Sequence, residues 1–511
     1  MAAKITNLRN WQVRALKAIT AAVRQAMGQF ALEASPSTGK TLVAVEAARA
    51  LNASGVTNLT LVMVPSQIIR DQVIERSQAQ GLNLSPIMDG DTLRAIRRNS
   101  GALPAQQNPD GSVTKIDGFA MTYSMVNDHV TLVDYICQKY KVFVIADEVH
   151  WNSETNTWGN NLKAATGNAT FRLGMSGTPF RHDEVEIPFF DTVTAGSKGT
   201  QKADFSYDYG QALADGDVAP VWFCYRDAHL AGDRMQGNVT KPFTASISDG
   251  EVNGLNPLAH ALHNVAGDQF AKDLLMEADA YLDQSRSTQN PEAGGLVVCS
   301  GIAHAKRVAE HLRSLCGKNE VVIATGDEAK AARQRIADFR TDGKRWLVAC
   351  KMVSEGVDIP RLRVMAYLAD IRAKRPFYQT VHRMTRLDPI TPAVPGQPTS
   401  AQQAVAVFLP DDPELRLNAS ELEKQVNNVI PNMPQAPAAG MGGGSAKEPV
   451  TYRVNRYTPR DGGASIGGEN YSAADIAAER AFLQTYASEM YLTLPDPVAI
   501  ALAADIRTTL E

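Results

Sequence analysis

The sequence predicts an α/β protein with two successive parallel-sheet blocks and a small, mostly helical C-terminal segment. Short runs rich in Val, Ile and Leu alternate with amphipathic helical stretches along most of the 511 residues. These runs are continuously apolar, so we expect strands that helices cover on both faces. The alternation occurs twice, and the chain is long enough for several domains of roughly 100–200 residues each.

The expected strands are apolar runs that end at Pro, Gly or a charged residue. They are residues 59–65, 141–148, 171–179, 295–301, 345–351 and 362–368. Amphipathic helices are expected between them, and residues 41–51 and 303–315 carry apolar positions at helical spacing. This succession of strand and helix predicts a mostly parallel sheet in each block.

Composition divides the chain into four regions. The first block covers about residues 1–215 and the second about 216–410. Residues 411–447 are expected to form a helix and a flexible linker, because their final part is rich in Pro, Ala and Gly and too poor in large apolar residues to pack. Residues 448–511 form a small accessory segment.

Two local patterns refine these regions. Residues 229–256 are polar and rich in Gly and Asn, which predicts a long loop inside the second block. In the accessory segment, Ser472 followed by Asp475 is typical of a helix N-terminus and predicts a helix over about residues 473–490.

Charge and composition exclude several classes of protein. The net charge of -4 excludes a wholly basic surface, so a nucleic acid would have to bind in a local groove. No apolar stretch reaches the roughly 18 residues of a membrane-spanning helix, and the N-terminus lacks a signal-peptide pattern. The five cysteines form no CxxC pair, so a metal site of that kind is not expected. We expect a cytosolic protein without a membrane partner.

The segment from Ala34 to Thr41, ASPSTGKT, matches the phosphate-binding loop G-x-x-x-x-G-K-[ST] except at its first position. It follows a short apolar stretch and begins a helix, which is the context that the motif requires. Backbone N–H groups at a helix start bind phosphate, so Ser37, Thr38 and Gly39 are candidate nucleotide contacts. Lys40 should reach the β- and γ-phosphates of ATP, and Thr41 should bind Mg²⁺.

Residues 145–150, IADEVH, end a buried strand with two adjacent carboxylates. A carboxylate at such a strand end can hold Mg²⁺ in part through water, and its neighbour can activate the attacking water. We assign Asp147 to the metal and Glu148 to the base. The alternative is an acidic surface turn, which the upstream phosphate-binding loop disfavours.

Further segments follow in a characteristic order. They are LRNWQ (8–12), LVMVPSQIIRDQ (61–72), MTYS (121–124), SGTP (176–179), VVCSGIAHA (297–305), SEGVDIP (354–360) and QTVHRMTR (379–386). Together with the two motifs above, this order resembles the superfamily 2 helicases, here with a DEVH box, over about residues 8–410. The resemblance implies two tandem RecA-like domains and a nucleic-acid-dependent ATPase that uses ATP and Mg²⁺.

The resemblance also implies roles for individual residues. Gln12 would read adenine, and Asp358 would bind ribose or an arginine. A third group would couple hydrolysis to domain motion: His150, Ser176, Thr178 and Gln379. Two positions depart from the family pattern, because Ser37 and His382 stand where the family commonly has glycine.

Arg383 and Arg386 are three residues apart, so we expect them on one helix face. The family pattern implies that they stabilise the transition state of phosphoryl transfer as arginine fingers, which can raise the rate by roughly 10³–10⁵. Hydrolysis should then require that the two blocks close. As a bare pattern, the alternative is a solvated basic helix face.

In this family the strand-end motifs follow the phosphate backbone of the nucleic acid. The candidates for such contacts are Ser66, Thr122, Tyr123, Ser300 and Lys351. Contacts of this kind fix register and carry no sequence information. Ordinary polarity at strand ends is the competing interpretation for each residue taken alone.

Two details favour DNA as the partner. Residues 176–181 (SGTPFR) and the LRxWQ opening resemble the restriction-motor and repair branch, and the patterns typical of RNA helicases are absent. We therefore expect an ATP-dependent DNA helicase or translocase. An ATP-gated nucleic-acid switch or clamp and an RNA helicase stay open as alternatives. The accessory segment shows no nuclease residues and is the expected docking site for a protein partner.

Overall fold

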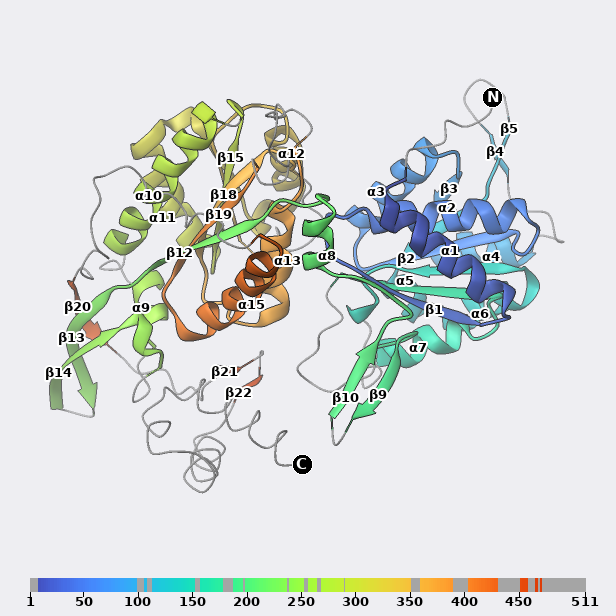
Figure 1. Ribbon diagram of the computed structural model, residues 1–511, viewed down its shortest axis with the longest axis horizontal. Coiled ribbons are helices and arrows are strands. Elements are labelled where there is room, and N and C mark those ends of the chain that lie inside the picture. Colours follow the sequence, from blue (N-terminus) through green and yellow to red (C-terminus); the bar gives the residue numbers. More distant parts are fainter. Residues whose placement is uncertain are drawn as a thin grey trace. The chain divides into compact units, whose positions relative to one another are not determined.

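The computed structural model divides the chain into two compact units, unit 1 (residues 1–209) and unit 2 (residues 210–511), shown in Figure 1. The sequence placed this division after residue 215. The residues that the structure describes are 8–98, 105–107, 113–151, 157–177, 187–195, 198–236, 239–251, 256–263, 268–288, 290–350, 359–388, 403–430, 451–457, 465–466 and 469–470.

Unit 1 is built on a seven-stranded sheet in the order β11-β1-β8-β7-β2-β6-β3, with every neighbouring pair parallel. The central strands β2 and β7 are buried at every position, which is why their sequences are continuously apolar. The strands are β1 Gln29–Ala34, β2 Leu59–Val64, β3 Leu84–Pro86, β6 Gly118–Thr122, β7 Val142–Ala146, β8 Phe171–Ser176 and β11 Phe205–Tyr207.

Helices connect and cover the strands of unit 1. Trp11 of the first helix stacks on Tyr207 of β11 with ring centroids 4.6 Å apart, which fixes that helix against the sheet edge. The helices are α1 Asn10–Arg24, α2 Lys40–Ala53, α3 Gln67–Ala79, α4 Gly90–Arg98, α5 Tyr123–Asp128, α6 Val130–Lys139, η1 Val149–Trp151 and α7 Thr157–Thr166. Two hairpins complete the unit: β4 Ala105–Gln107 with β5 Val113–Lys115, and β9 Asp191–Ala195 with β10 Lys198–Lys202.

Unit 2 contains a second parallel sheet, six-stranded in the order β12-β19-β18-β15-β17-β16. Its strands are β12 Val221–Arg226, β15 Gly294–Cys299, β16 Val321–Ala324, β17 Trp346–Cys350, β18 Leu362–Leu368 and β19 Val405–Pro410. The two sheets confirm the predicted fold class, a pair of tandem RecA-like domains.

In Figure 1, α10 and α11 lie on one side of the second sheet, and α13 and α15 lie on the other. The helices of unit 2 are α9 Pro257–His263, α10 Asp268–Thr288, α11 Ile302–Cys316, α12 Ala329–Phe339, α13 Lys374–Met384 and α15 Pro413–Val429, with α8 Tyr209–Ala214 at the division and short turns η2 Ile247–Asp249, η4 Lys318–Glu320 and η5 Gly326–Glu328. Within the described ranges, none of the helices combines the length and apolarity that crossing a membrane would need.

Residues 229–256 are not the long loop that their polarity suggested. They contain the antiparallel strands β13 (His229–Gln236) and β14 (Val239–Ser246), followed by η2. Phe243 and Ala245 alternate with Thr244 and Ser246, and two residues including a glycine separate the strands, which together are a hairpin signal. The mixed composition of the segment obscured this period of two.

The accessory C-terminal segment contributes a strand where a mostly helical structure was expected. The strand β20 (Thr451–Tyr457) pairs in parallel with β13, so β14, β13 and β20 form a three-stranded sheet that Figure 1 shows apart from the main sheet of unit 2. A two-stranded pair, β21 Ser465–Ile466 with β22 Glu469–Asn470, follows. The helix expected over residues 473–490 lies outside the described residues.

Candidate functional site

The phosphate-binding loop joins β1 to α2 in unit 1, and two of its residues have left-handed backbone conformations. Ser37 and Gly39 adopt left-handed conformations with φ of 68° and 95°. The Thr38 hydroxyl donates to the carbonyl of Ser35 at 2.6 Å, which closes the turn. Left-handed residues at such positions are typical of loops whose backbone N–H groups bind an anion at a helix start, so we interpret this loop as an anion-binding nest.

Ser37 occupies a position where the helicase family commonly has glycine. A left-handed conformation costs a non-glycine residue about 1–2 kcal/mol. Ser37 adopts the left-handed conformation despite this cost. Strain of this kind is typical of functional loops, in which the surrounding structure holds the backbone in place. Gly39 has a different constraint, because a Cβ there would lie 2.8 Å from Nε2 of Gln12.

The start of α1 is attached to the same loop. Gln12 is buried, its Nε2 donates to the carbonyl of Gly39 at 3.2 Å, and its Oε1 accepts from the N–H of Arg9 at 2.9 Å. Arg9 also donates from Nη1 to the carbonyl of Thr38 at 3.2 Å. The structure therefore places Gln12 against the loop backbone. Sequence reasoning missed Arg9, although it lies in the same LRNWQ segment.

Lys40 and the two carboxylates meet at the carboxyl ends of the strands. Lys40 begins α2, is 8% exposed, and places Nζ 2.9 Å from Oε1 of Glu148. Asp147 is 7% exposed, and its Oδ1 accepts from the N–H of Glu148 at 3.0 Å. Glu148 has a φ of 48°, a second strained backbone position beside the phosphate-binding loop.

The two carboxyl groups have pKa values displaced in opposite directions. Burial and the neighbouring Glu148 raise the pKa of Asp147 to about 6. Burial alone would also raise the pKa of Glu148, but Lys40, His150 and two hydrogen bonds lower it to about 2. Divergent pKa values of adjacent carboxyls are a frequent property of catalytic sites. Glu148 is therefore the ionised partner of Lys40. A cation that binds beside Asp147 would stabilise the ionised form of its carboxyl group.

Residues that follow β7 contact residues at the end of β8, and Glu148 takes part in these contacts. The N–H of Gly177 donates to Oε2 of Glu148 at 3.3 Å, and a Cβ at Gly177 would lie 2.7 Å from Nζ of Lys40. His150 is fully buried, with Nδ1 2.8 Å from Oγ of Ser176 and 3.5 Å from Oε2 of Glu148. Two of the predicted coupling residues therefore contact each other beside the acid pair. Thr178, the third in unit 1, lies outside the described residues.

Thr41 and Asp147 lie close to each other, on the wall of a small cavity that is otherwise lined by apolar residues. Among the described residues, no group of three or more His, Cys, Asp or Glu side chains could hold a metal ion by itself. Mg²⁺ is usually bound by one or two protein oxygens together with substrate phosphates and water. The assignment of Mg²⁺ to Thr41 and Asp147 stays a prediction.

The candidate nucleic-acid contacts of unit 1 lie at strand ends, but they differ in accessibility. The hydroxyls of Ser66 and Thr122 accept N–H groups at the starts of α3 and α5, at 3.5 Å and 3.4 Å, and so cap those helices. Tyr123 was assigned wrongly. It is 2% exposed, and its hydroxyl donates to the carbonyl of Asp147 at 2.7 Å. It therefore supports the end of β7 from within the core.

In unit 2, α13 carries Gln379 and Arg383, but it ends at Met384. Arg386 therefore follows the helix, and the expectation that both arginines share one helix face was wrong. Backbone contacts fix this end: the carbonyl of Thr385 accepts from the N–H of Ala219 at 2.7 Å. His382, which replaces a family glycine, is accommodated by burial against the Tyr378 ring, 5.8 Å between centroids.

The remaining predicted residues of unit 2 are placed only in part. Ser300 follows β15, and its hydroxyl accepts from the N–H of Asp370 at 3.1 Å, which joins two strand ends. Lys351 and Asp358 lie outside the described residues.

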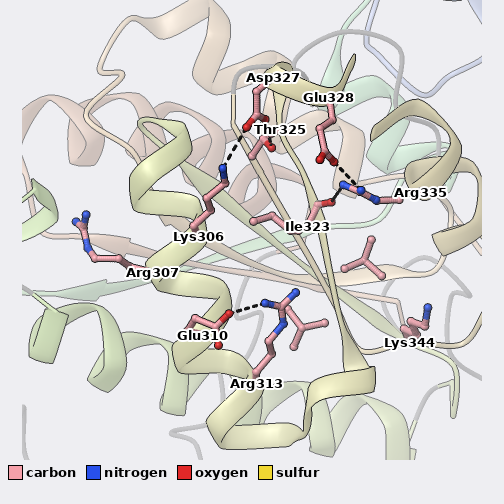
Figure 2. Close-up of a pocket in the computed structure, with 12 residues that line it drawn as sticks. Lys306, Arg307, Glu310, Arg313, Ile323, Thr325, Asp327, Glu328, Arg335 and Lys344 are labelled. Atoms are coloured by element: carbon pink, nitrogen blue, oxygen red, sulfur yellow. Dashed lines mark hydrogen bonds and ion pairs between the residues drawn. The ribbon is translucent and has the colours of Figure 1, made fainter. Parts of the chain in front are cut away.

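Unit 2 also has an open pocket of about 820 Å³ between α11, β16 and α12, shown in Figure 2. Its cations are largely paired with carboxylates on the pocket wall, so the pocket does not present the concentrated positive charge that a polyphosphate would require. The pairs are Lys306 with Asp327, Arg313 with Glu310, and Arg335 with Glu328, at 3.1, 2.6 and 2.6 Å. We place no nucleotide site there.

Comparison with known proteins agrees with this geometry. Residues 5–181 match the family described as type III restriction enzyme, res subunit (ResIII). A protein of Mycobacterium tuberculosis described as uncharacterized is 31% identical over 432 residues, which cover 83% of this chain. The matched region spans 64% of the length of that relative.

Two solved structures share the fold. One is a fragment assigned as an HsdR subunit of a type I restriction enzyme from Vibrio vulnificus, with a TM-score of 0.50, 15% identity, and coverage of 90% of this chain and 69% of that one. The other is the ATP-dependent type ISP restriction-modification enzyme LlaBIII bound to DNA, with a TM-score of 0.50, 13% identity, and coverage of 83% and 33%. Residues 5–181 therefore match the ResIII family model, and the chain shares a fold of two parallel sheets with these solved structures.

Proposed function

We propose that the protein is a DNA-dependent ATPase that uses ATP hydrolysis to translocate on DNA or to unwind it. The observation that carries the proposal is the cluster of Lys40, Asp147 and Glu148 beside the anion-binding nest of unit 1. A cation, a carboxylate of raised pKa and a carboxylate of lowered pKa provide the parts that phosphoryl transfer to water requires.

Each residue of the cluster has a distinct task. Lys40 exchanges its contact with Glu148 for the β- and γ-phosphates when ATP occupies the nest. Mg²⁺ would be held by Thr41 and Asp147, partly through water, and would neutralise charge on the phosphates. Released from Lys40, Glu148 orients the attacking water and accepts its proton.

Residues beyond the nest complete the proposed cycle. Gln12 contributes to recognition of the nucleotide base through the loop that it contacts, and Asp358 contacts the ribose or an arginine. Arg383 and Arg386 stabilise the transition state. The contact between His150 and Ser176, with Thr178 and Gln379, couples hydrolysis to movement.

DNA is the proposed track because the matched family and LlaBIII are named for restriction enzymes, and the LlaBIII structure is bound to DNA. The proposed contacts are Ser66, Thr122, Ser300 and Lys351. The hydroxyls among them lie at strand ends or helix starts, where main-chain N–H groups can also bind phosphate. Such contacts are independent of base sequence, so binding should weaken as salt rises.

The test measures ATP hydrolysis by the full chain with no nucleic acid, single-stranded DNA, duplex DNA or RNA, alongside strand displacement. We expect DNA to stimulate hydrolysis more than RNA, and movement or displacement to require ATP. Preferential stimulation by RNA would replace the proposal with an RNA helicase. Stimulated hydrolysis without displacement or translocation would indicate a nucleic-acid switch or clamp.

A further inference from the structure

Arg372 lies just before α13 and joins three helices of unit 2. Its Nε and Nη2 donate to the carboxylate of Asp412 at 2.9–3.1 Å, and Nη2 also donates to Oδ1 of Asn256 at 3.0 Å. The carbonyl of Arg372 accepts from Nδ2 of Asn418 on α15 at 2.7 Å. The side chain and the backbone of one residue are thus both fixed.

Both acceptors are themselves helix caps. Asp412 accepts the N–H groups of Glu414 and Leu415 at the start of α15, at 3.2 and 3.3 Å. Asn256 accepts the N–H of Ala259 at the start of α9, at 3.0 Å. One guanidinium therefore connects the starts of α9 and α15 to the start of α13.

The geometry favours arginine over lysine at this position. The side chain of Arg372 is 12% exposed and that of Asp412 is 2% exposed, so water screens the pair little. A planar guanidinium can bind one carboxylate with two nitrogens and still reach a second acceptor, whereas an ammonium group cannot reproduce this fixed arrangement.

The first turns of α13 are also attached to α15 by side chains. Lys374 pairs with Glu421 at 2.6 Å, and the Tyr378 hydroxyl donates to the same carboxylate at 2.8 Å. α13 has 11 residues, and at about 1.5 Å per residue it extends roughly 16 Å from Arg372 toward Arg383. A tilt of a few degrees at its start would move the arginine end by roughly 1 Å, and displacement of that size can cost about 10²-fold in rate.

We infer that Arg372 is a positioning residue, which sets the orientation of α13 and thereby the placement of Arg383 and Arg386 for ATP hydrolysis. Through Asn256 it also connects α13 to α9, which contacts the short turn η2 that follows β14. This inference rests on the proposed function, because a positioning role has meaning only for an enzyme that hydrolyses ATP.

The test compares Arg372→Lys with Arg345→Lys in the full chain. Arg345 is a matched control, since it pairs with Asp279 at 2.7 Å and the two side chains are 14% and 11% exposed. Measurements are kcat and KM for DNA-stimulated ATP hydrolysis, nucleotide affinity, and the thermal unfolding midpoint. We expect Arg372→Lys to lower kcat by about tenfold with KM and affinity unchanged. Arg345→Lys should lower the unfolding midpoint comparably and leave kcat within about twofold.

Asn256→Ser is a milder second variant, because serine still caps α9 but is too short to reach Arg372. It should lower kcat by a few-fold without a change in the unfolding midpoint, and it keeps the test valid if Arg372→Lys does not fold. Equal kcat in Asn256→Ser and wild type, or equal losses in Arg372→Lys and Arg345→Lys, would overturn the inference. A wild-type protein without DNA-stimulated hydrolysis would instead refute the proposed function.

Discussion

In unit 1 the buried cation Lys40 faces the carboxylate of Glu148 at 2.9 Å, whereas in unit 2 the buried cations Arg361 and Arg363 face mainly neutral oxygens. Arg361 donates to the carbonyls of Phe339, Glu292 and Lys344, and Arg363 donates to carbonyls and to Oε1 of Gln403. Burial lowers the pKa of both arginines to about 10, so both remain charged near neutral pH.

Lys40 belongs to a candidate chemical site, whereas Arg361 and Arg363 stabilise the fold of unit 2. Lys40 pairs with Glu148, a contact that the proposed function has it exchange for phosphate, and it lies beside the strained backbone of Ser37 and Glu148. Arg361 and Arg363 lie at the amino end of β18, and Arg363 also donates to the carbonyl of Arg386 at 3.5 Å. Most of their acceptors are backbone carbonyls, so these arginines hold strands and loops together.

The largest expected effect is on turnover in a variant of the second unit. Arg386→Ala should retain ATP binding and lose hydrolysis by roughly 10³–10⁵-fold, because an arginine that stabilises transition-state charge is not needed to bind the nucleotide. Single-turnover hydrolysis and equilibrium nucleotide binding measure the two properties. The exposed residue Arg333 of α12 supplies the control, and Arg333→Ala should behave as wild type. Normal turnover in Arg386→Ala would remove Arg386 from the proposed mechanism.

A scaffold arginine should have the opposite profile. Arg361→Ala leaves one buried and two part-buried carbonyls without this donor, and we expect a loss of about 3 kcal/mol in the free energy of unfolding. Turnover per folded molecule should be unchanged. Denaturant titration measures the loss, with Arg313→Ala, which removes an exposed ion pair, expected to cost under about 1 kcal/mol. A reduced kcat at full folding would show that Arg361 is more than scaffold.

The smallest expected effect is a pH dependence at Asp147. Its pKa is raised on folding, so the folded state binds the proton more tightly than the unfolded chain does. Its contribution to stability without metal therefore falls as pH rises from about 4 to about 6. Near pH 6, binding of Mg²⁺ with ATP should release up to one proton, measurable by calorimetry in buffers of different ionisation enthalpy. Equal proton release in Asp147→Asn would contradict this assignment.

The sequence was most informative where one physical requirement determines the residues. Strands buried on both faces must be continuously apolar, so β2, β7 and β18 were found with nearly the observed bounds. The loop before Lys40 and the adjacent carboxylates were also identifiable, because phosphate and metal binding restrict residue type and spacing.

Long-range contacts were not predictable in this way. Tyr123 follows a strand end like the other candidate contacts, and only the structure shows that its hydroxyl lies in the core beneath Asp147. Arg372 contacts Asp412 and Asn256, which lie 40 and 116 residues away along the chain. No local sequence pattern predicts these contacts, because neither helical nor strand periodicity depends on them.

The central claim is that the acid pair beside Lys40 hydrolyses ATP, and Glu148→Gln tests it most directly. Glutamine keeps the size of the side chain but removes the charge that accepts a proton. DNA-stimulated ATP turnover should fall by roughly 10²–10⁴-fold, as for loss of a general base, while ATP still binds. Turnover equal to that of the wild type would contradict the account.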